Sequence, residues 1–198
     1  MNSSILTTHV GSLPRSKELS ELLFAKDKKE NIDQALFNDT VKKNVDEVVK
    51  RQLDVGIDFV SDGEMSKISY ATYVKDRIKG FSGESERRAP ADLDAFPEYK
   101  TKIANSGGTP TYTRPCCTSE LEIKDEESLK TDIENFSKAL NANGHSQAFM
   151  NAASPGVINV FMPNKFYQND DEYLEKLSNI MSAEYKAITK NNLHLQLD

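Results

Sequence analysis

Short apolar runs alternate with one-faced helical segments along most of this 198-residue chain, and this alternation limits its possible folds more than any other feature. The segment 125–144 has apolar residues at steps of four, three and four: Leu129, Ile133, Phe136 and Leu140. Such spacing places them on one face of a helix. Similar patterns predict further helices at 39–56, 171–190, 17–25 and 68–78. The runs between them predict strands at 6–10, 58–61, 115–123, 148–152 and 193–197. Strands that alternate with amphipathic helices indicate βαβ units, a parallel sheet and an α/β fold.

Length and composition favour one domain that covers residues 1–198. With 37% hydrophobic and 28% charged residues, the chain can bury a core and remain soluble. The segment 80–109 interrupts the alternation with several glycines and prolines, and we expect a long excursion there over one end of the domain. A formal net charge of -6 argues against a nucleic acid or an anionic membrane as partner, because neither is attracted to an acidic surface.

The features that indicate a cellular compartment predict a cytoplasmic protein. The first residues, MNSSIL, lack a basic region and a long apolar run, and no window approaches the ~18 to 20 apolar residues that a membrane span needs. The two cysteines, Cys116 and Cys117, are adjacent, which disfavours a disulfide between them and excludes a disulfide framework. A reducing compartment fits this cysteine usage.

The final residues 193–198 alternate between leucine and polar side chains. In a strand, the leucines then face one side while His194, Gln196 and Asp198 face the other. If helices cover the apolar side, Asp198 points inward at the carboxyl end of the strand. Barrels and open α/β sheets both place their ligands at that end of the strands.

Two other predicted strand ends carry residues suited to binding an amino acid. Val10, Gly11 and Ser12 follow the first strand, where exposed N–H groups and a hydroxyl can hold a carboxylate. Glu64 follows Gly63 just beyond the second strand, and its carboxylate can bind an ammonium group together with Asp198. Ordinary turns at both places are the alternative interpretation.

Five stretches of the chain, in order, resemble the cobalamin-independent methionine synthase family, and specifically its shorter, single-barrel members. They are TTHVGSLPR, GIDFVSDGEMSK, RRAPADLDAFPEY, AFMNAASPGVINVFMPN and EYKAITKNNLHLQLD. The resemblance implies a TIM-type (β/α)8 barrel. It also implies an enzyme that transfers a methyl group from 5-methyltetrahydrofolate to the thiol of homocysteine, which zinc activates by lowering the thiol pKa.

The resemblance assigns roles to several of these positions. The stretch Val10, Gly11 and Ser12 matches a loop that holds the homocysteine carboxylate, whereas Glu64 and Asp198 match acidic contacts to its amino group. The turn 154–156 matches another strand end, without a role that we can assign. The zinc ligands of the family lie beyond the strand that ends at Asp198, so we assign no catalytic residue and no metal ligand within this chain.

About five predicted strands, against the eight of a closed TIM barrel, predict an incomplete barrel and an amino-terminal portion of a longer protein. Open barrel edges favour self-association or a complementing chain. A substitute zinc site built from His9, Cys116, Cys117 and Glu64 is conceivable, although buried small residues are the simpler interpretation of the cysteines. A related transferase with a different thiol substrate also stays open, as does a catalytically inactive or assembly-dependent half-barrel.

Three further groups of residues could contact ligands. Arg15 could bind a carboxylate of the substrate or of a folate tail, and a surface charge is the alternative. The pair Arg87 and Arg88 could meet an acidic tail, although solvent exposure is the simpler expectation. Four aromatic residues could stack on a pterin or pack beneath a loop: Phe161, Phe166, Tyr167 and Tyr173.

Overall fold

The computed structural model describes residues 5–85, 91–105 and 112–198, and these contain twelve helical or strand elements. The helices are α1 (Lys17–Asp27), α2 (Gln34–Asp54), α3 (Val74–Arg77), α4 (Pro97–Asn105), α5 (Glu127–Ala142), α6 (Pro155–Phe161), α7 (Asp170–Lys190) and the 3-10 helix η1 (Ala91–Ala95). The strands are β1 (Ile78–Ser82), β2 (Cys116–Ile123), β3 (Phe149–Ala152) and β4 (His194–Leu197). Arg87, Arg88 and the loop glycines Gly107 and Gly108 lie outside the described residues.

Four segments run parallel and next to one another in the centre of the molecule. β3 and β4 pair in parallel, with Phe149 opposite His194 and Ala152 opposite Leu197. Single parallel bridges extend the array, because Thr8 pairs with Phe59 and Val60 pairs with Ala148. The spatial order therefore follows the chain order, and the predicted α/β fold with parallel strands is confirmed. The described residues form no closed barrel, and the incomplete barrel stays a prediction.

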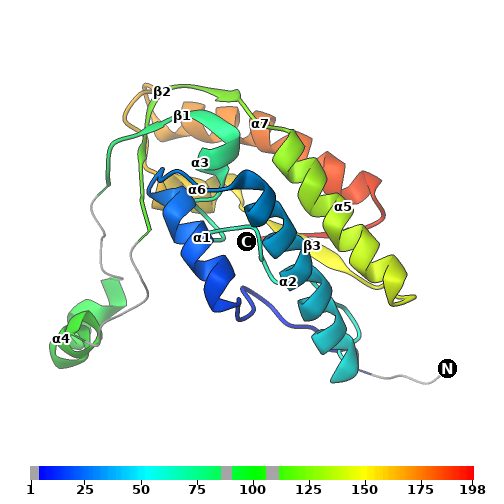
Figure 1. The fold of residues 1–198 in the computed structure, drawn as a ribbon. Helices are drawn as coiled ribbons and strands as arrows, with labels where there is room; N and C mark the ends of the chain where they lie inside the picture. Colours follow the sequence, from blue (N-terminus) through cyan, green and yellow to red (C-terminus); the bar gives the residue numbers. More distant parts are fainter. Residues whose placement is uncertain (1–4, 86–90, 106–111) are drawn as a thin grey trace.

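Helices cover one face of this array. α1, α2 and α5 pack side by side in that order (Figure 1), and their apolar faces share one core with strand residues such as Val60, Met150 and Ala152. A second core lies between the amino-terminal half of α7, α6 and β2. Ile158, Tyr173 and Leu177 are fully buried in it. Within the described ranges, no helix combines the length and the apolar character that crossing a bilayer requires.

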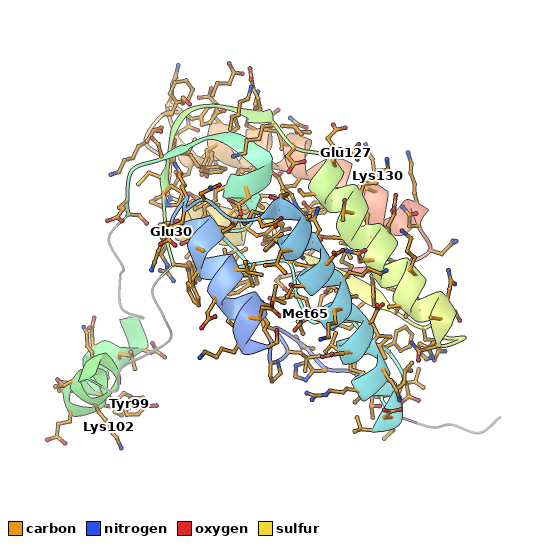
Figure 2. All side chains as sticks on the ribbon, in the orientation of Figure 1. Glu30, Met65, Tyr99, Lys102, Glu127 and Lys130 are labelled. Atoms are coloured by element: carbon orange, nitrogen blue, oxygen red, sulfur yellow. The ribbon has the colours of Figure 1, made fainter. Side chains whose placement is uncertain are left out.

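Two of the predicted helices match the structure closely, and a capping side chain explains the different start of a third. α5 and α7 lie close to the predicted 125–144 and 171–190, and Figure 2 shows Glu127 and Lys130 at the amino-terminal end of α5. α2 begins five residues before the predicted start at Asp39. The reason is Asp33, whose Oδ1 accepts hydrogen bonds from the N–H groups of Ala35 and Leu36.

The predicted helix 68–78 is wrong over most of its length, since only α3, at its end, is helical. Ser69 Oγ accepts hydrogen bonds from the N–H groups of Ala71 and Thr72, which offers the backbone an alternative to the helix. This segment instead forms turns that carry buried polar side chains into the interior.

The predicted strand 115–123 exists as β2, but its expected place in the parallel sheet is wrong. β2 pairs antiparallel with β1 in a separate two-stranded sheet, with Ile78 opposite Ile123. β1 was not predicted. Gly80 interrupts the apolar pattern of β1 and has a φ of 104°. The backbone of β2 lies so close to it that a Cβ would be 2.8 Å from Glu120 O.

Gly63 is expected to tolerate no side chain. Its φ is +63°, and a Cβ there would lie 3.0–3.2 Å from side-chain atoms of Met65, Leu13 and Val48. These three side chains pack in the core beside α2, and Figure 2 labels Met65 there. We expect Gly63→Ala to lower the free energy of unfolding by about 2–3 kcal/mol, measured by urea denaturation. Gly144→Ala is the matched control, because Gly144 has a φ of +62° but open space around its Cβ position. Equal losses in both variants would contradict the crowding argument.

Candidate functional site

The loop after the second parallel segment holds Glu64 in a fixed, strained position. The side-chain amide of Gln52 on α2 forms two hydrogen bonds with the backbone of Ser61. Its Nε2 donates to Ser61 O at 2.8 Å, and its Oε1 accepts from Ser61 N at 3.0 Å. Asp62 Oδ1 accepts from the N–H of Glu64 at 3.0 Å. Glu64 itself has a φ of 57°, which is uncommon for a residue with a side chain. Lys29 and Asn192 share this conformation just after α1 and α7, so at Glu64 it is the buried setting at a strand end that points to a function.

Neutral donors bind both oxygens of the Glu64 carboxylate. Ser12 Oγ donates to Oε2 at 2.5 Å, and Asn151 Nδ2 donates to Oε1 at 2.6 Å. Ser12 belongs to the loop after the first segment, while Asn151 lies in β3, so three strand ends meet at this carboxylate. The backbone also joins the first two loops, since Leu13 N–H donates to Gly63 O at 3.1 Å.

Asp198 completes the cluster at the end of β4. Its Oδ2 accepts a hydrogen bond from Asn151 Nδ2 at 2.8 Å, and its Oδ1 accepts one from Gln196 Nε2 at 2.7 Å. In the part of the chain that the structure describes, neither Glu64 nor Asp198 forms an ion pair with a lysine or arginine. Two carboxylates are thus held together by neutral groups that align them without cancelling their charge.

The structure therefore brings together Ser12, Glu64 and Asp198, which the sequence places far apart. We name Ser12, Glu64, Asn151 and Asp198 the carboxylate cluster. The predicted alternation in the last strand holds for Leu193 and Leu195, which pack in the core beneath the helices, while Gln196 and Asp198 contact each other; Leu197 is 51% exposed and is not part of that core. Binding of an amino acid by this cluster stays a prediction.

The loop with Val10, Gly11 and Ser12 lies open at the edge of the cluster. Val10 is 61% exposed, and Gly11 has a φ of +85° with no atom within 4 Å of a Cβ position. The backbone N–H groups of Gly11 and Ser12 have no partner among the described residues and are free to bind a ligand. Ser12 has only one hydroxyl proton and gives it to Glu64, so its hydroxyl must turn before it can donate to a ligand carboxylate.

Arg15 stabilises the loop that carries Glu64 through hydrogen bonds to its backbone. Its Nη2 donates to the backbone oxygens of Glu64 and Lys67, each at 2.8 Å. Burial lowers the pKa of Arg15, and the nearby carboxylates of Glu64 and Asp62 oppose that shift. The Nε–H of Arg15 is buried without a partner in the described structure, so contact with a ligand carboxylate stays a prediction for this residue.

Sequence reasoning missed two residues at the centre of the site, Asn151 and Lys67. The Lys67 side chain is 2% exposed, and its Nζ lies 2.6 Å from Asn151 O and 4.6 Å from the centroid of the Tyr73 ring. The signal for Asn151 is its position as the polar residue of an apolar strand. No signal marked Lys67, because a lysine in a turn is normally solvated.

Behind Lys67 lies a buried ionic network, which sequence reasoning also missed. Arg77 pairs with Asp132 at 2.5 Å and with Glu184 at 3.1 Å, and Tyr73 Oη donates to Glu184 Oε1 at 2.5 Å. Burial raises the pKa of Tyr73 well above its ordinary value, and the neighbouring Glu184 carboxylate adds to this shift. The network links α3, α5 and α7.

The predicted aromatic residues divide into two groups. Tyr173 and Tyr167 stack at 5.7 Å between ring centroids, and Tyr173 is fully buried, so packing explains these two. Phe161 instead contacts Tyr70 edge-on at 5.5 Å and lies 4.6 Å from the Arg114 guanidinium. Burial raises the pKa of Tyr70.

The described residues do not fit the zinc ion that the resemblance implies. Across 5–85, 91–105 and 112–198, no group of three or more His, Cys, Asp or Glu side chains is placed to hold a metal. Cys116 and Cys117 are buried in β2, with their Sγ atoms facing the backbone oxygens of Glu84 and Ser119. Burial raises the pKa of Cys117 to about 11, which keeps it a thiol. The substitute site with His9 and Glu64 is therefore not formed, and buried packing of the cysteines is confirmed.

Comparisons with known proteins match this chain to methionine synthases. Residues 5–92 match the family model for the catalytic domain of the cobalamin-independent synthase. A methionine synthase of Saccharolobus solfataricus is 26% identical over 187 residues, which are 93% of this chain and 49% of that protein. A 5-methyltetrahydropteroyltriglutamate–homocysteine methyltransferase of Bifidobacterium longum is 29% identical over 75 residues, which are 38% of this chain and 10% of that protein.

A solved structure shows the same fold. The B12-independent methionine synthase of Shewanella sp. W3-18-1, in complex with selenomethionine, superposes with a TM-score of 0.67 at 17% identity. The match covers 97% of this chain and 50% of that one. The chain thus spans about half the length of the curated relatives that match most of it. The family resemblance predicted from the five sequence stretches is confirmed.

Proposed function

Because this chain is related to the cobalamin-independent methionine synthase family, we propose that it binds homocysteine as the acceptor of a methyl group. The observation that carries this proposal is the carboxylate cluster, in which Glu64 and Asp198 lie within 2.8 Å of one Asn151 nitrogen and form no ion pair with a lysine or arginine of the described ranges. A ligand ammonium group supplies the missing positive charge. The open N–H groups of Gly11 and Ser12 lie at the rim of the cluster and suit the carboxylate of the same amino acid.

The proposed reaction transfers the methyl group of 5-methyltetrahydrofolate to the homocysteine sulfur. The bond between the methyl carbon and the folate N5 breaks as the sulfur–carbon bond forms, and the thiol proton replaces the methyl group on N5. The name of the Bifidobacterium relative supports these substrates, and the selenomethionine in the Shewanella structure is an amino acid of the product type. Tyr70, Phe161 and Arg114 form one group of planar side chains on which a pterin could stack in this proposal.

Activation of the thiol is not assigned to residues of this chain. When bound in a homologous enzyme, zinc would lower the thiol pKa and so supply the thiolate. In this proposal the described residues bind and orient the amino acid, in one partial barrel of a cytoplasmic protein. A complementing chain or a second copy at the open edges remains part of the same proposal.

Glu64→Gln is expected to weaken the binding of L-homocysteine at least about tenfold, because a charge-assisted contact to the ammonium group is lost. Glutamine keeps the shape, and its Oε1 can still accept from Asn151 while its Nε2 faces Ser12, whose hydroxyl can turn to accept. The measurement is isothermal calorimetry with L-homocysteine and with 4-mercaptobutanoate, which has the same thiol and carboxylate but no amine.

The second ligand and a surface variant control this experiment. Binding of 4-mercaptobutanoate should be unchanged in Glu64→Gln, and Glu122→Gln, on the exposed face of β2, should bind both ligands as the wild type does. A wild-type chain that binds the two thiols equally would show that no amine is recognised, in favour of a different thiol substrate. A chain that binds neither would contradict the proposed acceptor.

A further inference from the structure

Asn151 ties the two carboxylates of the cluster to a single atom. Its side chain is 4% exposed, and its Nδ2 donates one proton to Glu64 Oε1 at 2.6 Å and the other to Asp198 Oδ2 at 2.8 Å. An amide nitrogen has two protons, so both are used. The two carboxylates carry like charges and repel each other, and a hydrogen-bond donor that they share offsets this repulsion.

The surroundings of the Asn151 amide favour one orientation. Lys67 Nζ donates to the backbone oxygen of Asn151 at 2.6 Å and lies 3.5 Å from the side-chain Oδ1, and an ammonium group can only donate. The amide therefore lies between a cation on its oxygen side and two carboxylates on its nitrogen side. The reversed amide would place NH₂ against the ammonium and the oxygen against both carboxylates, which is unfavourable at each contact.

We infer that Asn151 is a positioning residue that holds Glu64 and Asp198 as a preformed pair for the ligand amine. The inference rests on the proposed function and adds to it the residue that prepares the amine site. A neutral amide suits this task better than a lysine or arginine in its place. A cation would pair with the carboxylates and compete with the ammonium group, whereas the amide aligns them and leaves their charge available.

Asn151→Leu tests the inference, since leucine has nearly the same shape and no hydrogen-bonding group. The quantity measured is amine discrimination, the ratio of the dissociation constants for 4-mercaptobutanoate and L-homocysteine. We expect this ratio to fall about tenfold or more in Asn151→Leu, because the two carboxylates lose their shared donor. A purely structural role would weaken both ligands together and leave the ratio unchanged.

Asn44→Leu is the matched control. Asn44 is an equally buried asparagine, but its amide contacts Thr40 O and the N–H of Ser16 rather than the cluster. In Asn44→Leu, the ratio of the dissociation constants for 4-mercaptobutanoate and L-homocysteine should stay at the wild-type value. An unchanged ratio in Asn151→Leu, in a wild type that does discriminate, would overturn the inference and leave the proposed function standing.

A second measurement needs neither folding of the leucine variant nor a bound ligand. In the unliganded chain, the two Asn151 side-chain amide protons should exchange slowly with water in NMR spectra, and their signals should move in Glu64→Gln and in Asp198→Asn. Rapid exchange, or signals unmoved by both changes, would overturn the inference. If the wild type binds neither thiol, the proposed acceptor is wrong and this spectrum still decides the role of Asn151.

Discussion

Arg77→Met is expected to lower the free energy of unfolding by about 3–5 kcal/mol at pH 7, because it leaves two buried carboxylates without their cation. Arg77 lies 2.5 Å from Asp132 and 3.1 Å from Glu184, and all three side chains are at least nine-tenths buried. Burial alone would lower the pKa of Arg77, but Glu184 and Asp132 together hold it above its ordinary value. Urea denaturation followed by circular dichroism measures the loss.

Lys79→Met is the matched control for this change. The Lys79 ammonium lies 3.7 Å from Glu122 on the open face of the hairpin, where solvent screens the pair. We expect this variant to stay within about 0.5 kcal/mol of the wild type. A loss in Arg77→Met as small as the control's would contradict the role assigned to the buried network.

The deficit of Arg77→Met should shrink as the pH falls. In the wild type, burial raises the pKa of Asp132, while Arg77 and a hydrogen bond from Ser66 oppose the shift. Without Arg77 the folded-state pKa of Asp132 rises further above its unfolded value, so the folded state holds the proton more tightly. The variant therefore gains stability as the pH falls from neutral through that raised pKa toward the unfolded value of about 4. A deficit that stays constant over this interval would show that the carboxylates are not its cause.

The parts of the fold that sequence patterns predicted are those that local contacts determine. α5 and α7 carry apolar stripes along their length, so their ranges follow from the spacing of the apolar residues. The hairpin of β1 and β2 could not be found this way. Its two strands come from distant parts of the chain, and the glycine of β1 is explained by the partner backbone and not by its neighbours in sequence.

The candidate site was predictable as far as parallel strand ends could be recognised. Ser12, Glu64 and Asp198 each follow a predicted strand, and parallel pairing brings such ends to one edge. Asn151 requires one more step: β3 must lie between the second and last strands, with its polar residue on the face of Asp198. Lys67 depends on the exact course of a turn region that was predicted as a helix, so no periodic pattern could place it.

Asp27→Asn is expected to cost about 3 kcal/mol of unfolding free energy or more, because it removes the counter-ion of a buried lysine. Asp27 ends α1, and its carboxylate accepts hydrogen bonds from Lys75 Nζ on α3 and from both the N–H and the hydroxyl of Thr113. These three donors use both carboxylate oxygens. Asparagine retains one oxygen, and its NH₂ group must face either the ammonium or the Thr113 N–H, a donor against a donor.

The exposed pair of Lys50 and Asp54, 2.8 Å apart on α2, provides the control for Asp27→Asn. Asp54→Asn should change stability by no more than about 0.5 kcal/mol, since both side chains are solvated and screened. Hydrogen exchange then locates the effect of Asp27→Asn: the Thr113 amide, which donates to Asp27 Oδ2 at 2.8 Å, should lose protection under conditions where most of the molecule remains folded. If Thr113 kept its wild-type protection while the global stability fell, the loss would come from α1 alone. Asp27 would then be a helix-end residue and not the link that joins α1 to α3 and to the chain entering β2.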